Sequence, residues 1–167
     1  VETIEEDILK FSASRFAVAP ARRASFKLKK YKLVANIPYY LTSALIRKFL
    51  EEENKPQKII LMIQKEVAQR ICACLPTGRR QNKKCKMSIL ALSVQFYADP
   101  KILFYVSKEN FWPAPTIDSA VIEITPKNKL PNIAEKLFFK IVKAGFANKR
   151  KQLAGNLTKN FKFGAEF

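Results

Sequence analysis

The sequence contains no histidine among its 167 residues. Serine–histidine and cysteine–histidine catalysis are therefore excluded within these residues. A structural zinc site would also lack its usual fourth ligand beside the three cysteines. We interpret Cys72, Cys74 and Cys85 as reduced thiols and expect no bound metal. Any reaction that these residues carry out must proceed without an imidazole.

Acidic residues, glycine and long apolar runs are also scarce. Asp and Glu number 14 against 31 Lys and Arg, which gives a formal net charge of +17. The four glycines are scattered, and none forms a Gly-x-Gly loop. There is no run of about 18 uncharged apolar residues that would span a bilayer, and the acidic start "VETIEEDILK" is unlike a signal peptide. We therefore expect a soluble, cytoplasmic protein with no membrane partner.

The excess of positive charge is typical of a protein that binds a polyanion such as RNA, because Lys and Arg release counterions from the phosphates. The charge is clustered in "KLKKYK", "GRRQNKKCK" and "ANKRKQ", which favours nucleic-acid binding over a basic surface that serves solubility alone. The candidate phosphate contacts are Arg79, Arg80, Lys83, Lys84 and Lys86 in the second cluster, and Lys149, Arg150 and Lys151 in the third.

Hydrophobic periodicity predicts alternating strands and helices in one main domain. Two successive strand–helix units predict a parallel α/β sheet. We expect Thr42 or Ser43 to cap the first helix, whose acidic end opposes the helix dipole. The expected strands are 1–4, 32–36, 58–63, 101–107 and 119–125, and the expected helices are 41–53, 65–75 and 87–98.

A boundary is predicted at residues 126–132, "PKNKLPN", which are polar and bracketed by prolines. Beyond it Ile133, Leu137 and Ile141 recur every four residues, as on one face of a helix. The tail "NKRKQLAGNLTKNF" resembles the start of a second helix. We therefore expect an α/β unit over residues 1–126 and the beginning of a small helical unit over residues 127–167.

The stretch "NIPYYL" at residues 36–41 stands at the carboxyl end of an expected strand, where α/β sheets bind ligands. The Asn36 side-chain carbonyl and the backbone carbonyl before Pro38 are two acceptors at a fixed angle, which together suit an amino group. A neighbouring aromatic ring would stack on the heterocycle that carries this amine, as in the recognition of a flipped-out base. The alternative is a turn with Tyr39 and Tyr40 simply packed, and the stretch alone favours that alternative.

Four stretches in order, "NIPYYLTSALIRKFL", "IILMIQKEVAQRI", "FWPAPTIDSAVIEI" and "GFANKRKQLAGNL", resemble the ribosomal RNA adenine dimethyltransferases, the small-subunit methyltransferase A family. "NIPY" and the spacing of Phe111, Pro113 and Pro115 before "DSAV" are the most specific parts. The resemblance covers nearly the whole chain. It implies an incomplete class I, Rossmann-like methyltransferase sheet over residues 1–126, followed by the start of the helical C-terminal domain over residues 127–167.

The resemblance also implies an activity. It is the S-adenosylmethionine-dependent dimethylation of the exocyclic amines of two adjacent adenines near the 3′ end of 16S rRNA, in immature 30S particles, by a monomeric enzyme of ribosome biogenesis. Asn36 and the backbone carbonyl of Ile37 or Pro38 would accept hydrogen bonds from the amine. Tyr39 would stack on the adenine, and Phe111 would form the opposite wall. Asp7 and Asn36 would contact the cofactor, although Glu6 stands where the family usually has Gly.

The family's glycine-rich cofactor loop and ribose-binding acid have no counterpart in these residues and would precede Val1. We therefore expect these 167 residues alone to be inactive, without tight cofactor binding, and residues up to about Phe11 to be frayed or docked in a non-native place. Two alternatives remain: a non-catalytic RNA-binding factor of ribosome assembly on the same fold, and a macrolide-resistance methyltransferase that acts on large-subunit rRNA. "IQKEVAQRI" and "DSAVI" favour the small-subunit group.

Overall fold

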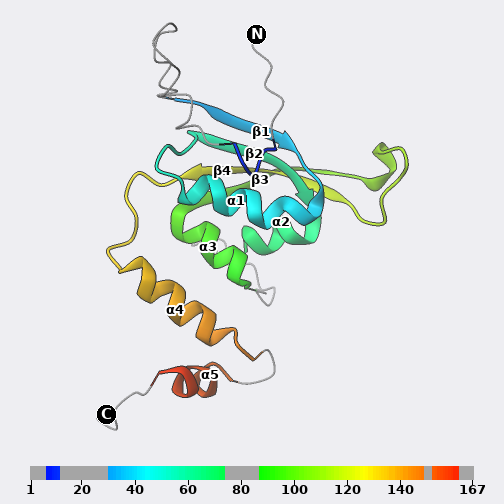
Figure 1. Ribbon diagram of the computed structural model, residues 1–167. Helices are drawn as coiled ribbons and strands as arrows, with labels where there is room; N and C mark the ends of the chain where they lie inside the picture. Colours follow the sequence, from blue (N-terminus) through cyan, green and yellow to red (C-terminus); the bar gives the residue numbers. More distant parts are fainter. Residues whose placement is uncertain (1–6, 12–29, 74–86, 149–151, 162–167) are drawn as a thin grey trace, which may run out of the picture.

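The computed structural model describes residues 7–11, 30–73, 87–148 and 152–161. Figure 1 shows a twisted sheet with helices on one side of it and two further helices leading away. The strands are β1 Lys32–Asn36, β2 Lys58–Gln64, β3 Ala98–Val106 and β4 Ser119–Pro126; the α-helices are α1 Thr42–Glu51, α2 Lys65–Ile71, α3 Ile89–Tyr97, α4 Glu135–Gly145 and α5 Leu153–Asn160; the 3-10 turns are η2 Tyr39–Leu41 and η3 Lys108–Asn110.

The sheet is mixed, with the strand order β1-β2-β4-β3. β1 and β2 are parallel, whereas β4 is antiparallel to both β2 and β3. The prediction of a parallel sheet is therefore correct for the first two strands and wrong for the last two. Residues 107–118 join β3 to β4 without an α-helix, and antiparallel neighbours need no helical crossover. The pairing of β3 with β4 shifts register between Ile102 and Phe104.

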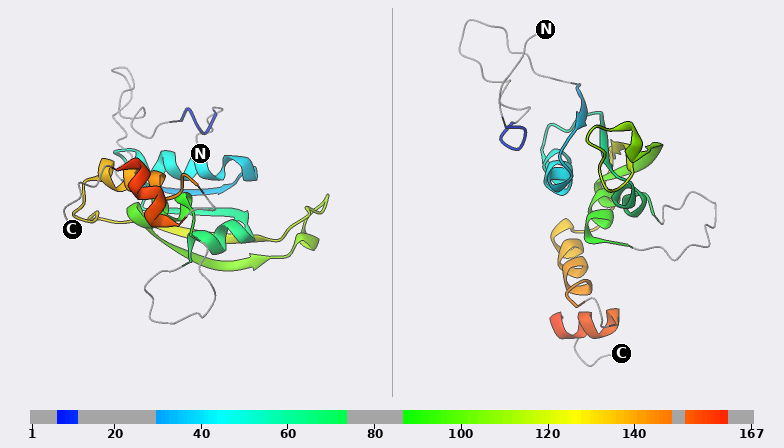
Figure 2. Two further views of the ribbon diagram at one scale, coloured as in Figure 1. Left: turned by 90° about the horizontal axis from the view of Figure 1, so that it is seen from below. Right: turned by 90° about the vertical axis from the view of Figure 1, so that its right-hand side faces the viewer.

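The core lies between the sheet and α1, α2 and α3, which cover one face (Figures 1 and 2). Along β2 every second residue is fully buried, as expected for a strand with one face on the core. Leu45 and Phe49 of α1 pack there with no exposed surface, together with Ile59 and Leu61 of β2. These two positions lie on the apolar face of α1, and its packing holds α1 against the strand pair that carries "NIPYYL".

The predicted cap of α1 is wrong. Thr42 is the first residue of the helix and is buried, and the capping position is occupied by Leu41, which offers no side-chain hydrogen bond. The turn η2 runs directly into α1, so the Thr42 N–H donates to the Tyr39 carbonyl. A 3-10 turn of this kind satisfies amide groups that a polar cap would otherwise serve.

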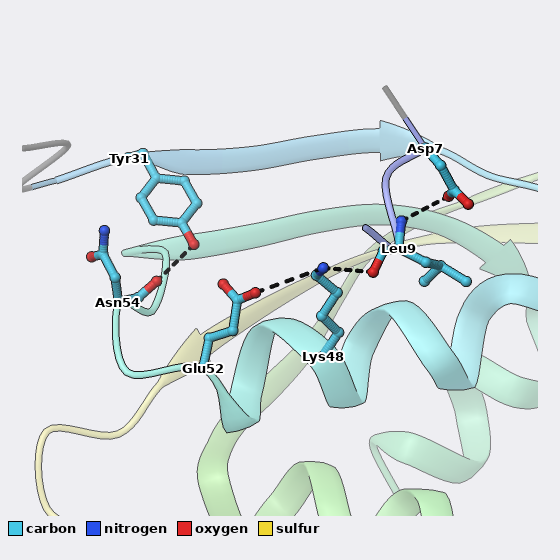
Figure 3. A network of polar contacts seen from close by, with 6 residues as sticks. All are labelled: Asp7, Leu9, Tyr31, Lys48, Glu52 and Asn54. Atoms are coloured by element: carbon cyan, nitrogen blue, oxygen red, sulfur yellow. Dashed lines mark hydrogen bonds and ion pairs between the residues drawn. The ribbon is translucent and has the colours of Figure 1, made fainter. Parts of the chain in front are cut away.

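The acidic end of α1 is balanced by basic side chains one turn earlier. Arg47 lies 3.7 Å from Glu51, and Lys48 lies 3.7 Å from Glu52. Such i,i+4 pairs contribute a few tenths of a kcal/mol each, roughly 0.2–0.5, which offsets acids placed against the helix dipole. The Lys48 Nζ also donates a 2.7 Å hydrogen bond to the Leu9 carbonyl (Figure 3). Lys48 therefore fastens the N-terminal segment to α1.

Residues 7–11 form a turn rather than a strand. The Asp7 carboxylate accepts the Leu9 N–H at 2.9 Å, and the Asp7 carbonyl accepts the Phe11 N–H at 2.9 Å. Ile8, Leu9 and Phe11 are half-buried and pack against the core. Residues 7–11 therefore pack on the core as a turn, and the expectation of a frayed segment or of docking in a non-native place stays a prediction. The expected strand at residues 1–4 lies outside the described residues.

The helix α4 packs against α3 through aromatic rings. Phe96 stacks on Phe138 with ring centroids 4.5 Å apart, and Phe139 stacks on Tyr97 at 5.8 Å. The Tyr97 hydroxyl donates to the Glu135 carboxylate at 2.7 Å. Offset and edge-to-face ring pairs of this kind stabilise beyond their buried area. A division of the chain at residue 126 stays a prediction, and α4 contacts the α/β unit directly.

A buried asparagine joins α5 to α4. The Asn156 side chain is 1% exposed and donates to the carbonyls of Gly145 and Asn148, and its carbonyl oxygen accepts from the Asn148 side chain. A buried amide with its donors and acceptor engaged fixes the angle between two short helices. The predicted second helix after residue 148 is therefore present as α5, and it is held to α4 by a specific polar network.

Candidate functional site

"NIPYYL" lies at the carboxyl edge of the two parallel strands. β1 ends at Asn36, which is paired with Met62 near the end of β2. Pro38 then takes φ −55° and ψ 136°, ends the strand and precedes η2. Asn36 is exposed, whereas Ile37 is buried and anchors the turn in the core. The predicted position of this stretch at a strand end is confirmed, and Asn36 presents its amide at that edge.

The backbone carbonyls of Ile37 and Pro38 at this edge differ in whether they take part in the η2 turn. The Pro38 carbonyl accepts the Leu41 N–H at 3.0 Å, as part of η2. The Ile37 carbonyl is not part of that turn. Of the two backbone carbonyls that the resemblance leaves open, the one that η2 engages is therefore that of Pro38.

The two tyrosines of the stretch have opposite environments. Tyr39 is half-buried, and its hydroxyl forms a 2.8 Å hydrogen bond with Ser119 Oγ on β4. Ser119 has no exposed surface. Tyr40 is 82% exposed. The Tyr40 ring is therefore not packed, and the Tyr39 ring is fixed in orientation by a partner that is 80 residues away in the sequence.

Asp118, the residue before Ser119, ties the β3–β4 connection to α2. Its carboxylate accepts from Lys65 Nζ at 2.8 Å and from the Lys108 N–H at 3.3 Å. The hydrogen bond from Lys65, followed by the one from the Lys108 amide, holds the pKa of Asp118 below its usual range, and the same bond raises the pKa of Lys65. The pair is therefore ionised at neutral pH and closes residues 107–118 into a fixed loop.

Phe111 lies in that loop and is half-buried. Its N–H donates to the Lys108 carbonyl at 3.3 Å, at the end of η3. The structure brings the loop of Phe111 and the turn of Tyr39 to one edge, because Asp118 anchors the first and Ser119 the second. The rings of Tyr39 and Phe111 form no stacked or edge contact with each other in the described part of the chain.

An open pocket of about 410 Å³ lies between the start of α2 and the same loop. Its volume is within the range of roughly 300–1,000 Å³ that is usual for small-ligand sites. Glu66 and Asp118 on its wall are each already paired with a cation, Arg70 and Lys65 respectively. The lining residues are Lys65, Glu66, Gln69, Lys108, Thr116, Ile117 and Asp118.

The described residues fit only part of S-adenosylmethionine. Asp7 is exposed and carries a carboxylate that can accept from an adenine amine, and Asn36 is exposed at the end of β1. The glycines in the described ranges, Gly145 and Gly155, lie in the helical pair α4–α5, so neither forms a loop at the sheet edge for the methionine end.

Several sequence predictions fall outside the described residues. The predicted phosphate contacts do so entirely, as do two of the three cysteines. Burial raises the pKa of the remaining Cys72 thiol to about 11, so it stays protonated near neutral pH. No helix within the described ranges is long and apolar enough to cross a membrane, and these ranges hold no group of three candidate metal ligands. The residues outside are Arg79, Arg80, Lys83, Lys84, Lys86, Lys149, Arg150, Lys151, Cys74 and Cys85.

Comparison with known proteins assigns the chain to a family. The family model "Ribosomal RNA adenine dimethylase" matches residues 1–166. The chain belongs to this family. The ribosomal RNA small subunit methyltransferase A of Dehalococcoides mccartyi (strain CBDB1) is 43% identical over 129 residues, which are 76% of this chain and 41% of that protein. The enzyme of the same name from Fusobacterium nucleatum is 44% identical over 132 residues, which are 75% of this chain and 46% of that protein. The chain thus spans less than half the length of these curated relatives.

Solved structures of methyltransferases share the fold. A dimethyladenosine transferase from Plasmodium falciparum superposes with a TM-score of 0.61 at 26% identity, over 76% of this chain and 44% of that one. The 23S rRNA methyltransferase ErmE gives a TM-score of 0.61 at 17% identity, over 88% of this chain and 55% of that one. The predicted α/β class is confirmed: the mixed sheet is that of the Rossmann-like class I methyltransferases.

Sequence reasoning missed Asp118 and Ser119, which connect the β3–β4 loop to α2 and to the turn of Tyr39. "DSAV" marks the family resemblance, yet Asp118 and Ser119 receive no role from the sequence alone. Their partners Tyr39 and Lys65 are far away along the chain and become apparent only in the fold. Trp112 is equally unexpected: it is 98% exposed, next to Phe111, although tryptophan is usually well buried.

The Tyr39–Ser119 contact predicts strong coupling between the two positions. Tyr39→Phe leaves Ser119 Oγ buried without its partner, and we expect a loss of about 1–3 kcal/mol in the free energy of unfolding. Ser119→Ala should behave similarly, whereas the double variant should cost less than the sum of the two. Urea unfolding of the four proteins measures the coupling energy, which we expect at about 0.5–3 kcal/mol. Additive effects would contradict a direct hydrogen bond.

Proposed function

We propose that this chain forms part of an S-adenosylmethionine-dependent rRNA adenine dimethyltransferase that modifies two adjacent adenines near the 3′ end of 16S rRNA. The observation that carries the proposal is the placement of Asn36 and Ile37 at the carboxyl edge of β1 in a chain of this family. Immature 30S particles as substrate, a monomeric state and a cytoplasmic location belong to the same proposal.

The chemistry follows from the two acceptors. The Asn36 side-chain oxygen and the Ile37 carbonyl accept the two hydrogens of the adenine amine and thereby direct the nitrogen lone pair away from the strand end. The cofactor, when bound, supplies an electrophilic methyl group. Positive charge that develops on the amine in the transition state is stabilised by these fixed oxygens, which lie in place before the reaction. The extra proton passes to solvent, since Asn36 is exposed.

The ring of Tyr39 is the second element of the proposal. A ring that is already held by Ser119 loses little freedom when a base stacks on it, so most of the stacking energy contributes to binding. Phe111 is the proposed opposite wall. The loop that carries Phe111 is held by the hydrogen bonds of Asp118, and Tyr39 is held by the next residue, Ser119.

Small-subunit rRNA is favoured over large-subunit rRNA. Relatives at 43% and 44% identity carry the name small subunit methyltransferase A, whereas the likeness to the 23S enzyme ErmE is at 17% identity and concerns the fold. A non-catalytic assembly factor is the second candidate, and it predicts RNA binding without methyl transfer.

The deciding experiment is methyl transfer by the full-length protein. Purified protein, labelled S-adenosylmethionine and either immature 30S particles or 50S precursors are incubated, and the modified nucleotides are mapped. We expect dimethylated adenines at two adjacent positions in 16S rRNA only. Methylation confined to 23S rRNA would identify the resistance-type enzyme, and binding to 30S particles without methylation would identify the assembly factor.

The third basic cluster is proposed to bind phosphates. Replacing Lys149, Arg150 and Lys151 with Ala in the full-length protein should weaken rRNA binding and reduce the slope of log affinity against log salt by about 0.7–0.9 for each phosphate that is no longer neutralised. Binding measured across a salt series tests this. The matched control replaces Lys129, Lys136 and Lys140, which removes the same charge from the connection before α4 and from α4 itself. Equal slopes in the two triple variants would assign the cluster to solubility.

A further inference from the structure

The β3–β4 connection carries an unusual concentration of exposed aromatic side chains. We call residues 103–118 the aromatic arm: it comprises the end of β3, η3 and the loop to β4. Phe104, Tyr105 and Trp112 are 55%, 52% and 98% exposed. The aromatic residues just before β3, Phe96 and Tyr97, are buried in the contact with α4. Several large aromatic side chains that remain exposed on one segment indicate a surface that binds a partner.

The aromatic arm has a defined position at the proposed active edge. Figure 1 shows it extending beyond the ends of β1 and β2, on the side where Asn36 lies. Its base is fixed by the contacts of Asp118 with Lys65 and with the Lys108 amide. The residue after Asp118 is the hydrogen-bond partner of Tyr39. The arm is therefore anchored directly beside the residue that orients the proposed adenine-stacking ring.

The surroundings of the arm favour a nucleic acid as its partner. Lys65 lies with its Nζ 5.5 Å from the centre of the Tyr105 ring. Lys108 lines the pocket of about 410 Å³, in which both carboxylates already have cationic partners. An exposed ring can stack on any base, and the ammonium group of Lys108 at the pocket can bind a phosphate, whereas that of Lys65 is already paired with Asp118. In a chain of net charge +17 this combination matches an unpaired RNA strand better than an uncharged apolar partner.

We propose that the aromatic arm binds the unpaired RNA next to the target adenine. Trp112 stacks on a flanking base, and Lys108 in the pocket meets a phosphate of the same strand. This inference rests on the proposed function for the identity of the target base. It assigns to the arm a positioning role: a flanking nucleotide held at the arm limits where the target adenine can lie relative to Asn36. Trp112 is a binding residue in this account and takes no part in methyl transfer.

The chain offers a direct optical test, because Trp112 is its only tryptophan. Intrinsic fluorescence therefore reports this one side chain. The 167-residue chain is titrated with a short single-stranded RNA that contains two adjacent adenines, and separately with a blunt duplex of the same strand. We expect saturable quenching by the single strand, with much weaker quenching by the duplex, since paired bases are unavailable for stacking.

Variants test the energetic contribution of the ring. Binding of the labelled single strand is followed by anisotropy, which does not depend on tryptophan. We expect Trp112→Ala to weaken binding about 5- to 100-fold, the range given by loss of one stacked base, while Trp112→Phe retains most of the affinity. Leu130→Ala, which truncates an exposed apolar side chain outside the arm, is the matched control and should change nothing. Both altered side chains are exposed, so the variants should unfold at the wild-type midpoint.

The outcomes separate this inference from the proposed function. RNA binding without quenching, equal quenching by the duplex, or unchanged affinity in Trp112→Ala would each overturn the role of the arm, whatever the methylation result. Quenching and a loss of affinity in Trp112→Ala would support it even if the full-length protein failed to methylate 16S rRNA. In that case the arm would stand as a single-strand RNA site on a non-catalytic protein.

Discussion

Asn36→Ala in the full-length protein is expected to lower kcat for methyl transfer by about 100- to 1,000-fold, the usual effect of removing one fixed polar contact that acts on developing charge. RNA affinity should change by no more than about twofold, because the contact is realised chiefly in the transition state. The structural basis is local: Asn36 is an exposed residue at the very end of β1, so its loss creates no cavity in the core. Single-turnover methylation of immature 30S particles and a separate binding titration measure the two quantities.

Asn128→Ala is the matched control for this variant. Asn128 is exposed in the connection between β4 and α4, so truncating it removes the same amide group away from the sheet edge. We expect it to methylate at the wild-type rate. If Asn36→Ala were equally active, the proposed role of the amide would be wrong, and the Ile37 carbonyl would have to orient the amine by itself.

The positions of the strands and helices could be predicted because their hydrophobic patterns are local. In "KIILMI" the alternate burial of Ile59, Leu61 and Ile63 is what makes the segment a strand with one face on the core. The direction of a strand relative to its neighbours has no such local hydrophobic pattern. The pattern of residues 119–125 is compatible with either orientation, and β4 is antiparallel to β2 because residues 107–118 return the chain without a crossover helix.

The helix α4 shows a second limit. Two neighbouring apolar stripes are present in its sequence, and periodicity does not say which one faces the protein. The stripe of Ile133, Leu137 and Ile141 is exposed in the structure, whereas Phe138 and Phe139 pack against α3. The stripe with the aromatic rings faces the protein because Phe96 and Tyr97 of α3 provide ring partners for Phe138 and Phe139.

Only the part of the candidate site at the end of β1 could be predicted from the sequence. Pro38 must stop the strand, so the position of Asn36 at a sheet edge follows from the sequence. The rest of the site depends on contacts between segments that are distant in the sequence, such as that of Tyr39 with Ser119. No local pattern encodes these contacts. Burial offers a reason for it: a serine with no exposed surface requires a hydrogen-bond partner, and the tyrosine hydroxyl is the group that reaches it.

The second large effect is expected for Phe49→Ala, in the 167-residue chain. Phe49 has no exposed surface and is the largest of the fully buried side chains between α1 and the sheet. Its truncation removes apolar area from the core and leaves a cavity, which for phenylalanine costs about 3–5 kcal/mol. Domains of this size are stabilised by only about 5–15 kcal/mol, so the variant should lose a large share of its stability. Urea unfolding followed by far-UV circular dichroism should show a much lower midpoint with an unchanged slope.

Leu137→Ala is the control for Phe49→Ala. Leu137 is 48% exposed on α4, and truncating it should change the free energy of unfolding by no more than about 0.5 kcal/mol. The functional consequence distinguishes Phe49 from Asn36: well below its unfolding midpoint, the full-length Phe49→Ala protein should methylate at nearly the wild-type rate per folded molecule, because the Asn36 edge keeps its own contacts. A stable Phe49→Ala chain with the wild-type midpoint would mean that α1 is not held to the sheet by this core, and the placement of "NIPYYL" by α1 would have to be revised.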